Sequence, residues 1–379
     1  MSTAALAVMR RCAAAMVVLL GLAAASGCVG GFSGPLMTKS AVGVPGDALT
    51  AAGKQPFVYR SRGELVLATP ERIIARRPGT YTDVGFTRDN SRVFALDDTG
   101  GLVSLESTGG TISPTRIDCR CDRIFPLQGT SVGWWQPDGF ARTDLREPKP
   151  IVPLSVTPPP LRAPIAPGNV LSAPRLLAAD ATALIIDRIE APPGASWGIN
   201  HLFLVDPVTG AARELGQVDG INTALSSGAF RADGREVVFA GYSRDGTACG
   251  TGHLVVVTLP DGRIDPFGLP ALSTCSAVAD LRWVGATATA TGLLWEPTSP
   301  DRLTGTAVWT RSGVQWDRRG DAATLRYAAL TPQATMRIQR SGIDRVHAVH
   351  SGDLVLSVAT EMRVLAHDVV DIVVPWVLP

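Results

Sequence analysis

The chain has few charged and few aromatic residues, which make up 18% and 6% of its 379 residues. Lysine is nearly absent, because all 35 basic residues except Lys39, Lys54 and Lys149 are arginines. The 34 acidic residues almost balance the basic ones and leave a formal net charge of +1. A chain so close to neutral lacks the strongly basic character that nucleic-acid binding requires, and we expect no nucleic-acid partner.

Motifs for catalysis, metals and cofactors are also missing. There is no glycine-rich phosphate loop and no calcium-binding run of alternating aspartates. Segment 194–198 matches Gly-x-Ser-x-Gly, but prolines precede it and a strand-like run follows, whereas a nucleophile elbow lies between a strand and a helix. His347 and His350 are three apart in a strand-like run, which directs them to opposite faces. We therefore name no catalytic residue and expect neither a metal nor a cofactor.

Glycine and proline are abundant instead. The 39 glycines and 28 prolines make up about 18% of the chain, against roughly 12% in average proteins. Outside the N-terminal segment, no window keeps an apolar period of 3.6 residues over three turns. This composition favours many short elements joined by tight turns and excludes a helical bundle.

The N-terminal segment 1–27 has the pattern of an export signal. Arg10 and Arg11 precede an apolar stretch, 12–25, that ends in small residues. This stretch is too short to cross the roughly 30 Å of membrane hydrocarbon comfortably. We therefore predict a signal peptide rather than a retained membrane span.

Residues Ala25-Ser26-Gly27-Cys28 resemble the bacterial lipobox, although Ala25 stands where leucine is commoner. The resemblance implies cleavage before Cys28, acyl chains such as palmitate on that cysteine, and anchoring to the outer face of the cytoplasmic membrane. An ordinary secretory signal cut nearby is the alternative. The bias toward arginine over lysine fits a GC-rich bacterial genome. Cleavage would remove two positive charges and leave a net charge of −1, and segment 28–54 has the composition of a flexible tether.

The rest of the chain, 55–379, is rich in short β-type runs. They lie at 57–59, 65–67, 92–96, 102–105, 183–186, 202–205, 237–240, 254–259, 292–295, 306–309 and 354–358. Turn signals such as Asp89-Asn90 and Asp233-Gly234 separate them. The pattern predicts an all-β fold.

Two segments of the β region, 85–95 and 229–240, align with each other. Each has an aromatic residue, a two-residue turn at Asp89-Asn90 or Asp233-Gly234, and a strand that contains Phe-Ala. The two aspartates lie 144 residues apart, or three units of 48, and weaker echoes lie between them and beyond. A period in the forties with four short strands per unit is typical of a propeller blade.

These segments resemble the TolB-like β-propeller repeat, a relative of WD-type repeats, in which an aromatic-x-x-Asp-Gly hairpin joins the first two strands of a blade. The resemblance implies a single propeller of about seven four-stranded blades, with six or eight as alternatives. The residues that would shape the blade turns are Phe86, Asp89, Asp138, Gly139, Phe230, Asp233 and Gly234. The alternative is two β-sandwich domains with the proline-rich stretch 148–167 as linker; in a propeller, that stretch is an extended connection.

Four cysteines remain after Cys12 and Cys28 are set aside. An even number in an exported protein favours disulfides, and four cysteines allow three pairings. We favour Cys249 with Cys275, which leaves Cys119 to pair with Cys121.

The sequence favours the function of a membrane-anchored, non-catalytic binding or scaffolding module for a protein, a peptide or an envelope glycan. TolB-like propellers imply that loops around one mouth of the channel hold the partner. One alternative is an enzyme in the central channel, lactonase-like or acting on glycans, which three or more inward carboxylates, asparagines or histidines would favour. Another is an accessory or sensor subunit of a membrane signalling complex.

Overall fold

The computed structural model describes residues 52–108, 115–137, 139–148, 151–231, 233–243, 249–267, 269, 275–284, 287–312, 315–340 and 351–376. The expected signal peptide, Cys28, most of the expected tether, Asp138, His347 and His350 lie outside these residues. Within them, no helix has the length and apolar character needed to cross a membrane. The anchor therefore stays a prediction from the sequence.

Antiparallel strands make up most of the described chain, and they form five sheets. The sheet that joins the two ends of the chain contains, in spatial order, β23 (Thr324–Thr331), β24 (Ala334–Gln339), β25 (Gly352–Val358), β26 (Glu361–Val373), β1 (Phe57–Ser61), β2 (Glu64–Ala68) and β3 (Ile73–Pro78). The next contains β4 (Tyr81–Phe86), β5 (Arg92–Asp97), β6 (Gly101–Glu106) and β7 (Thr115–Asp118). A three-stranded sheet follows, with β8 (Phe125–Pro126), β9 (Ser131–Gln136) and β10 (Gly139–Asp144).

The remaining two sheets hold the middle of the chain. The larger contains β11 (Val170–Leu171), β12 (Arg175–Ala179), β13 (Leu184–Ala191), β14 (Gly198–Val205), β15 (Ala212–Phe230), β16 (Glu236–Ser243), β17 (Thr251–Thr258) and β18 (Arg263–Phe267). The smaller contains β19 (Ser276–Val284), β20 (Thr287–Glu296), β21 (Ser299–Ser312) and β22 (Gln315–Arg319).

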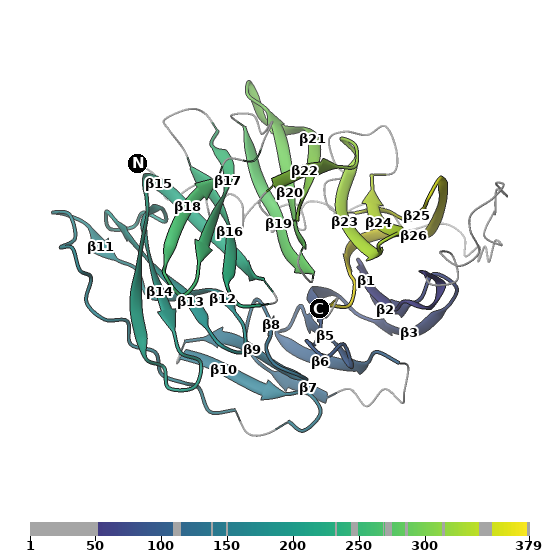
Figure 1. Cartoon of the computed structure of the whole chain (residues 1–379), viewed down its shortest axis with the longest axis horizontal. Coiled ribbons are helices and arrows are strands. Elements are labelled where there is room, and N and C mark those ends of the chain that lie inside the picture. Colours follow the sequence, from purple (N-terminus) through teal and green to yellow (C-terminus); the bar gives the residue numbers. More distant parts are fainter. Residues whose placement is uncertain are drawn as a thin grey trace, which may run out of the picture.

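The sheets follow one another in chain order around a common centre (Figure 1). This arrangement confirms the predicted all-β propeller and is not that of two separate sandwiches. The hydrogen bonds delimit five sheets, so they do not reproduce the predicted seven four-stranded blades as separate units. The two largest sheets each contain one unusually long strand, β15 or β26.

The ring is tied between its first and last described strands. Val58 pairs with Val373 and Arg60 pairs with Asp371, in an antiparallel register of β1 with β26. Because β26 also pairs with β25, the N-terminal strands complete a sheet that the C-terminal strands begin. Such closure leaves no free strand edge at the junction of the two chain ends.

Apolar clusters fill the space between neighbouring sheets. One cluster combines Val58 and Leu65 of the closing sheet with Phe86 and Val93 of the next. Phe86 is 1% exposed, as expected for an aromatic residue that packs between sheets. Phe230 is 3% exposed and packs among residues of its own eight-stranded sheet.

Glycine permits a close backbone approach at two equivalent points of the repeat. A Cβ on Gly85 would lie 2.4 Å from the ring of Phe94, and one on Gly228 would lie 2.3 Å from the ring of Phe239. Each glycine stands directly opposite its phenylalanine on the neighbouring strand. The ring therefore lies flat over the glycine backbone, a detail that the alignment of the two segments did not reveal.

Candidate binding site in the central charge cluster

Charged side chains from several different sheets form ion pairs with one another. They come from β1, β4, β19, β23 and β26 and from the segment between β7 and β8. We call this set the central charge cluster: Arg60, Asp83, Arg123, Asp280, Arg282, Arg326 and Asp371. It contains four arginines and three aspartates, so its formal charge is positive.

Asp371 is the most deeply buried carboxylate of the cluster, with 4% of its surface exposed. Its Oδ1 accepts hydrogen bonds from Arg282 Nη2 at 2.6 Å and from the backbone N–H of Ile372 at 2.8 Å. Its Oδ2 lies 3.5 Å from Arg60 Nε. Arg282 also donates from Nη1 to Ile372 O at 2.8 Å. These bonds tie β19 to the closing strands of a different sheet.

Asp280 is held between two arginines. Arg282 Nε donates to Asp280 Oδ1 at 3.1 Å, and Arg326 Nε lies 3.5 Å from Asp280 Oδ2. Burial alone would raise the pKa of Asp280, but the charges of Arg282 and Arg326 hold that pKa below its usual range. This carboxylate therefore stays ionised.

Asp83 differs from the other two aspartates because its contacts are with backbone groups. Its Oδ1 accepts from the Val84 N–H at 2.9 Å, and its Oδ2 accepts from the Ile124 N–H at 2.9 Å. Burial raises the pKa of Asp83, and the positive charge of Arg123 only partly offsets this. Asp83 is thus the carboxyl group of the cluster that takes up a proton most readily.

Arg123 is the arginine with the fewest partners. Its guanidinium carbon lies 5.0 Å from the centre of the Phe125 ring, and among the described residues no carboxylate forms an ion pair with it within 4.0 Å. Burial lowers the pKa of Arg123, while the charges of Asp83 and Asp280 act in the opposite direction. The adjacent Asp122 acts in the same direction as these two aspartates, so Arg123 is compensated by charges nearby rather than by a direct ion pair.

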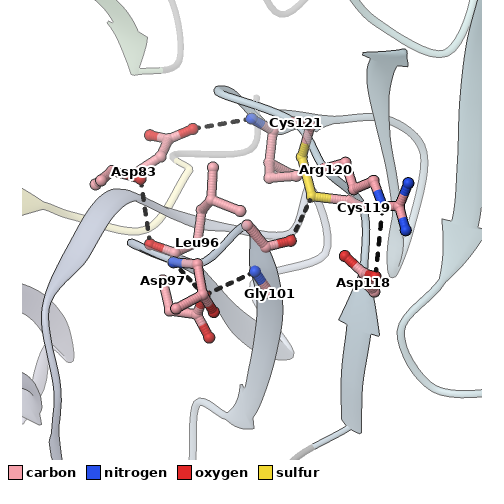
Figure 2. The surroundings of a disulfide bond; sticks show 12 residues. Asp83, Leu96, Asp97, Gly101, Asp118, Cys119, Arg120 and Cys121 are labelled. Carbon is pink, nitrogen blue, oxygen red and sulfur yellow. Dashed lines mark hydrogen bonds and ion pairs between the residues drawn. A yellow bond between two sulfur atoms is a disulfide. The ribbon is translucent and has the colours of Figure 1, made fainter. Parts of the chain in front are cut away.

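A disulfide holds the segment that carries Arg123. Cys119 and Cys121 are bonded at the end of β7, and Figure 2 shows the bridge on the turn that leads toward Asp83. The Cys119 N–H donates to Gly100 O at 3.1 Å, and Arg120 between the cysteines has a positive φ of 47°. The same segment then delivers the Ile124 N–H to Asp83. The bridge constrains the chain before Arg123, and the Ile124–Asp83 hydrogen bond constrains it after Arg123.

The second expected pair is also present, because Cys249 and Cys275 form a disulfide. It links the end of the segment between β16 and β17 to the residue before β19, 26 positions further along. Its neighbour Gly250 donates its N–H to the Tyr242 hydroxyl at 2.7 Å. This bridge therefore joins two adjacent sheets away from the central charge cluster.

None of the described blade-turn residues belongs to the central charge cluster. Phe86 and Phe230 end β4 and β15, Gly139 begins β10, and the other described ones lie in strand connections. Asp89 follows β4 and accepts from Thr87 Oγ1 at 2.7 Å and from Ser91 Oγ at 2.8 Å. Asp233 and Gly234 connect β15 to β16, and Gly234 has a positive φ of 68°. Gly139, with φ of 130°, begins β10, the third strand along its sheet, so its turn does not join the first two strands as the resemblance implied.

Sequence reasoning missed the central charge cluster because its members lie singly in different strands. A signal was present nevertheless. Asp371 interrupts the apolar run 369–373 and is buried, and a buried charge in such a run requires a partner elsewhere. Asp83 is the one charged residue of β4, and Asp280 shares β19 with Arg282 alone among charged residues. What the sequence did not show is which arginine supplies each partner.

Other features do not add to the central charge cluster. Surface hollows of about 450 Å³ and 360 Å³ have different linings, represented by Arg142 and Asp144 in one and by Arg76 and Arg363 in the other. Within the described part of the chain, no three histidine, cysteine or acidic side chains are placed to hold a metal ion. The cluster is therefore the site whose chemistry bears most on function.

Comparison with known proteins supports the fold and goes no further. No family model and no curated protein matches the chain. The tricorn protease superposes with a TM-score of 0.51 at 9% identity, over 83% of this chain and 33% of that one. BamB from Moraxella catarrhalis has a TM-score of 0.41 at 14% identity, over 76% of this chain and 91% of its own. The β-propeller domain of Cps50 (Swd1) from Myceliophteria thermophila has a TM-score of 0.44 at 12% identity, over 75% of this chain and 89% of its own.

The chain spans only about a third of the tricorn protease. At 9% identity that likeness concerns the fold alone. The other two structures have TM-scores below 0.5 and add nothing to it. What is established is therefore the class, an all-β propeller.

Proposed function

We propose that this protein is a membrane-anchored, extracytoplasmic β-propeller that acts as a non-catalytic binding or scaffolding module for a protein, a peptide or an envelope glycan. The observation that supports this role is the pairing in the central charge cluster. Asp280 and Asp371 are committed to Arg282 and its neighbours, at 3.1 Å and 2.6 Å. Because a guanidinium keeps its proton at physiological pH and the lowered pKa of Asp280 keeps that carboxylate ionised, the Asp280–Arg282 pair offers fixed charges rather than proton transfer.

The proposal includes a ring of seven blades. Residues 212–218 of β15 pair with β14, whereas residues 223–230 pair with β16. In the same way, β26 pairs mainly through 361–369 with β25 and through 369–373 with β1. If β15 and β26 are each divided at this change of partner, the closing sheet becomes two four-stranded units. The eight-stranded sheet becomes one four-stranded unit and one unit that has the two-residue β11 as a fifth strand. A bridge from Phe140 to Leu154 adds a fourth chain segment to the three-stranded sheet.

The anchor rests on Cys28. Wild-type cells fed an alkyne-labelled fatty acid should yield a labelled protein in the membrane fraction, and Cys28→Ala should lose the label and leave that fraction. A wild-type protein without label, cut elsewhere in the N-terminal segment, would instead support an ordinary secretory signal.

The binding role is tested by crosslinking in intact cells. The tagged full-length protein should recover a defined envelope component well above the amount recovered by an unrelated lipid-anchored propeller. The same component should be recovered when the bait and the candidate partner exchange tags. Recovery no better than that of the control propeller would refute the binding role.

A second candidate function, an enzyme of the central channel, is favoured by one observation. Asp83, Asp280 and Asp371 meet the number of inward carboxylates that such an enzyme needs, and Asp83 has a raised pKa suited to proton transfer. Turnover of a lactone or glycan substrate that Asp83→Asn abolishes, in a variant with unchanged unfolding temperature, would support this candidate over the binding module.

A further inference from the structure

Arg123 is the arginine of the central charge cluster that makes no ion pair within 4.0 Å among the described residues. Asp280 and Asp371 are paired with Arg282, Arg60 and Arg326. Both carboxylate oxygens of Asp83 accept hydrogen bonds from backbone N–H groups. The charges of Asp83, Asp280 and the adjacent Asp122 act on Arg123, but none of these carboxylates contacts its guanidinium directly.

We propose that the central charge cluster binds a carboxylate group of a ligand, held by the guanidinium of Arg123 with Arg282 and Arg326 beside it. A carboxylate carries one negative charge, whereas a phosphate would bring closer to two and would be repelled more strongly by Asp280 and Asp371. The planar guanidinium also matches the two oxygens of a carboxylate with parallel hydrogen bonds.

Arg326 provides a second, independent reason. Its Nε is buried and makes no hydrogen bond within the described residues, although Asp280 and Asp371 lie at 3.5 Å and 3.9 Å. A buried N–H group without an acceptor costs free energy, and an incoming oxygen removes that cost. Burial also lowers the pKa of Arg123, against the opposing charges of Asp83 and Asp280.

The geometry around Arg123 is held in place before any ligand arrives. The Cys119–Cys121 bridge lies two residues upstream, and the Ile124 N–H is bonded to Asp83 at 2.9 Å immediately downstream. Because the backbone that carries Arg123 is already held, it loses less conformational entropy when a ligand binds, which favours affinity. This inference rests on the proposed binding role and narrows it to ligands with a free carboxylate, either a peptide C-terminus or an acidic sugar.

Titration calorimetry on the purified chain tests the proposal with three probes at constant ionic strength. They are an N-acetylated dipeptide with a free C-terminus, the same dipeptide as its C-terminal amide, and glucuronate. We expect the free acid or glucuronate to bind at least about tenfold more tightly than the amide. Preference for the dipeptide indicates a peptide ligand, and preference for glucuronate indicates a glycan. Equal weak binding of all three probes overturns the proposal.

Variants locate the site. Arg123→Gln should weaken binding of the carboxylate by at least about tenfold, and Arg123→Lys should give an intermediate loss because it keeps the charge without the planar group. Arg318→Gln removes the same charge from an exposed position and should leave the affinity unchanged. Equal losses in Arg123→Gln and Arg318→Gln, or none in either, would overturn the assignment.

Thermal unfolding shows whether the variants are folded and provides a second measure of binding. The preferred carboxylate should raise the unfolding temperature of the wild type by mass action and leave that of Arg123→Gln unchanged. If the wild type binds no carboxylate but still recovers a partner by crosslinking, this inference fails and the binding module stands. If it binds the carboxylate and recovers no partner, the proposed scaffolding role fails instead.

Discussion

Asn90 connects the last described segment of the chain to the turn between β4 and β5. Its Nδ2 donates to Trp376 O at 2.8 Å, and its Oδ1 accepts from the Trp376 N–H at 2.7 Å. The indole of Trp376 donates from Nε1 to Phe86 O at 3.1 Å, and Arg88 lies 3.9 Å above the indole. We call this contact the C-terminal latch. It holds the segment after β26 against the neighbouring sheet.

Two substitutions separate the parts played by the side chain and the backbone of Asn90. Its φ is 57°, in the left-handed region that glycine adopts freely and alanine does not. Asn90→Gly should lose only the two hydrogen bonds, each worth about 0.5–1.5 kcal/mol, for a total of about 1–3 kcal/mol. Asn90→Ala loses the same bonds and adds about 1–2 kcal/mol of backbone strain. We therefore expect stability to fall from wild type to Gly to Ala.

Urea unfolding followed by circular dichroism measures these differences, and the mutants should share the slope of the wild type. The specific control is a chain that ends at residue 375, which lacks the backbone groups of Trp376 that Asn90 binds. In that chain Asn90→Gly should cost less than about 0.5 kcal/mol, because the coupling has gone. An equal cost in the full and the shortened chain would refute the C-terminal latch, as would an Asn90→Ala protein as stable as the wild type.

Three further predictions concern buried contacts. Replacing Cys119 and Cys121 by serine should weaken carboxylate binding roughly threefold to tenfold, because the Arg123 segment loses its fixed path; calorimetry would show no change if the bridge is irrelevant to the site. Burial alone would raise the pKa of Glu190, but hydrogen bonds from the Ala166 N–H and from His201 hold that pKa below its usual value. Ionised Glu190 therefore stabilises the folded protein fully above pH 4.5, and this contribution is lost as the pH falls further. Glu190→Gln should therefore flatten the loss of unfolding temperature between pH 5 and pH 3, and an unaltered pH profile would contradict this. Arg175→Met should cost roughly 3–5 kcal/mol, because Asp187 loses the guanidinium at 3.0 Å, and adding Asp187→Leu should recover much of that loss.

The Arg175 substitution also has a defined pH dependence. Burial already raises the pKa of Asp187, and loss of Arg175 would raise it further. A group whose pKa is higher in the folded protein than in the unfolded chain favours the folded state at low pH and loses that benefit as the pH rises. Arg175→Met should therefore be more damaging at pH 7 than at pH 4, and unfolding temperatures at the two values would show it.

Some structural features could be predicted from residue types alone. Asp-Gly and Asp-Asn pairs mark sharp turns because they tolerate positive φ, and Asn90 and Gly234 have it. The separation of the two repeat segments by three units of 48 residues predicted repeated strand units, and a ring of sheets is present. Both disulfides were predicted, because the favoured Cys249–Cys275 bridge left only Cys119 and Cys121 to pair. These are local or nearly local features, so the residue pattern carries them.

The central charge cluster and the limits of the sheets could not be obtained in this way. Arg60 and Asp371 are 311 residues apart, and Arg282 and Asp371 are 89 apart, so no local pattern links them. Only closure of the ring places these groups together in a poorly solvated space, where their charges must be compensated. The division into sheets also depends on tertiary structure, because β15 and β26 each change partner along their length. The sequence by itself thus determined the strands, their turns and the export signal that we expect, whereas the folded ring decided which charges meet and which arginine lacks a partner.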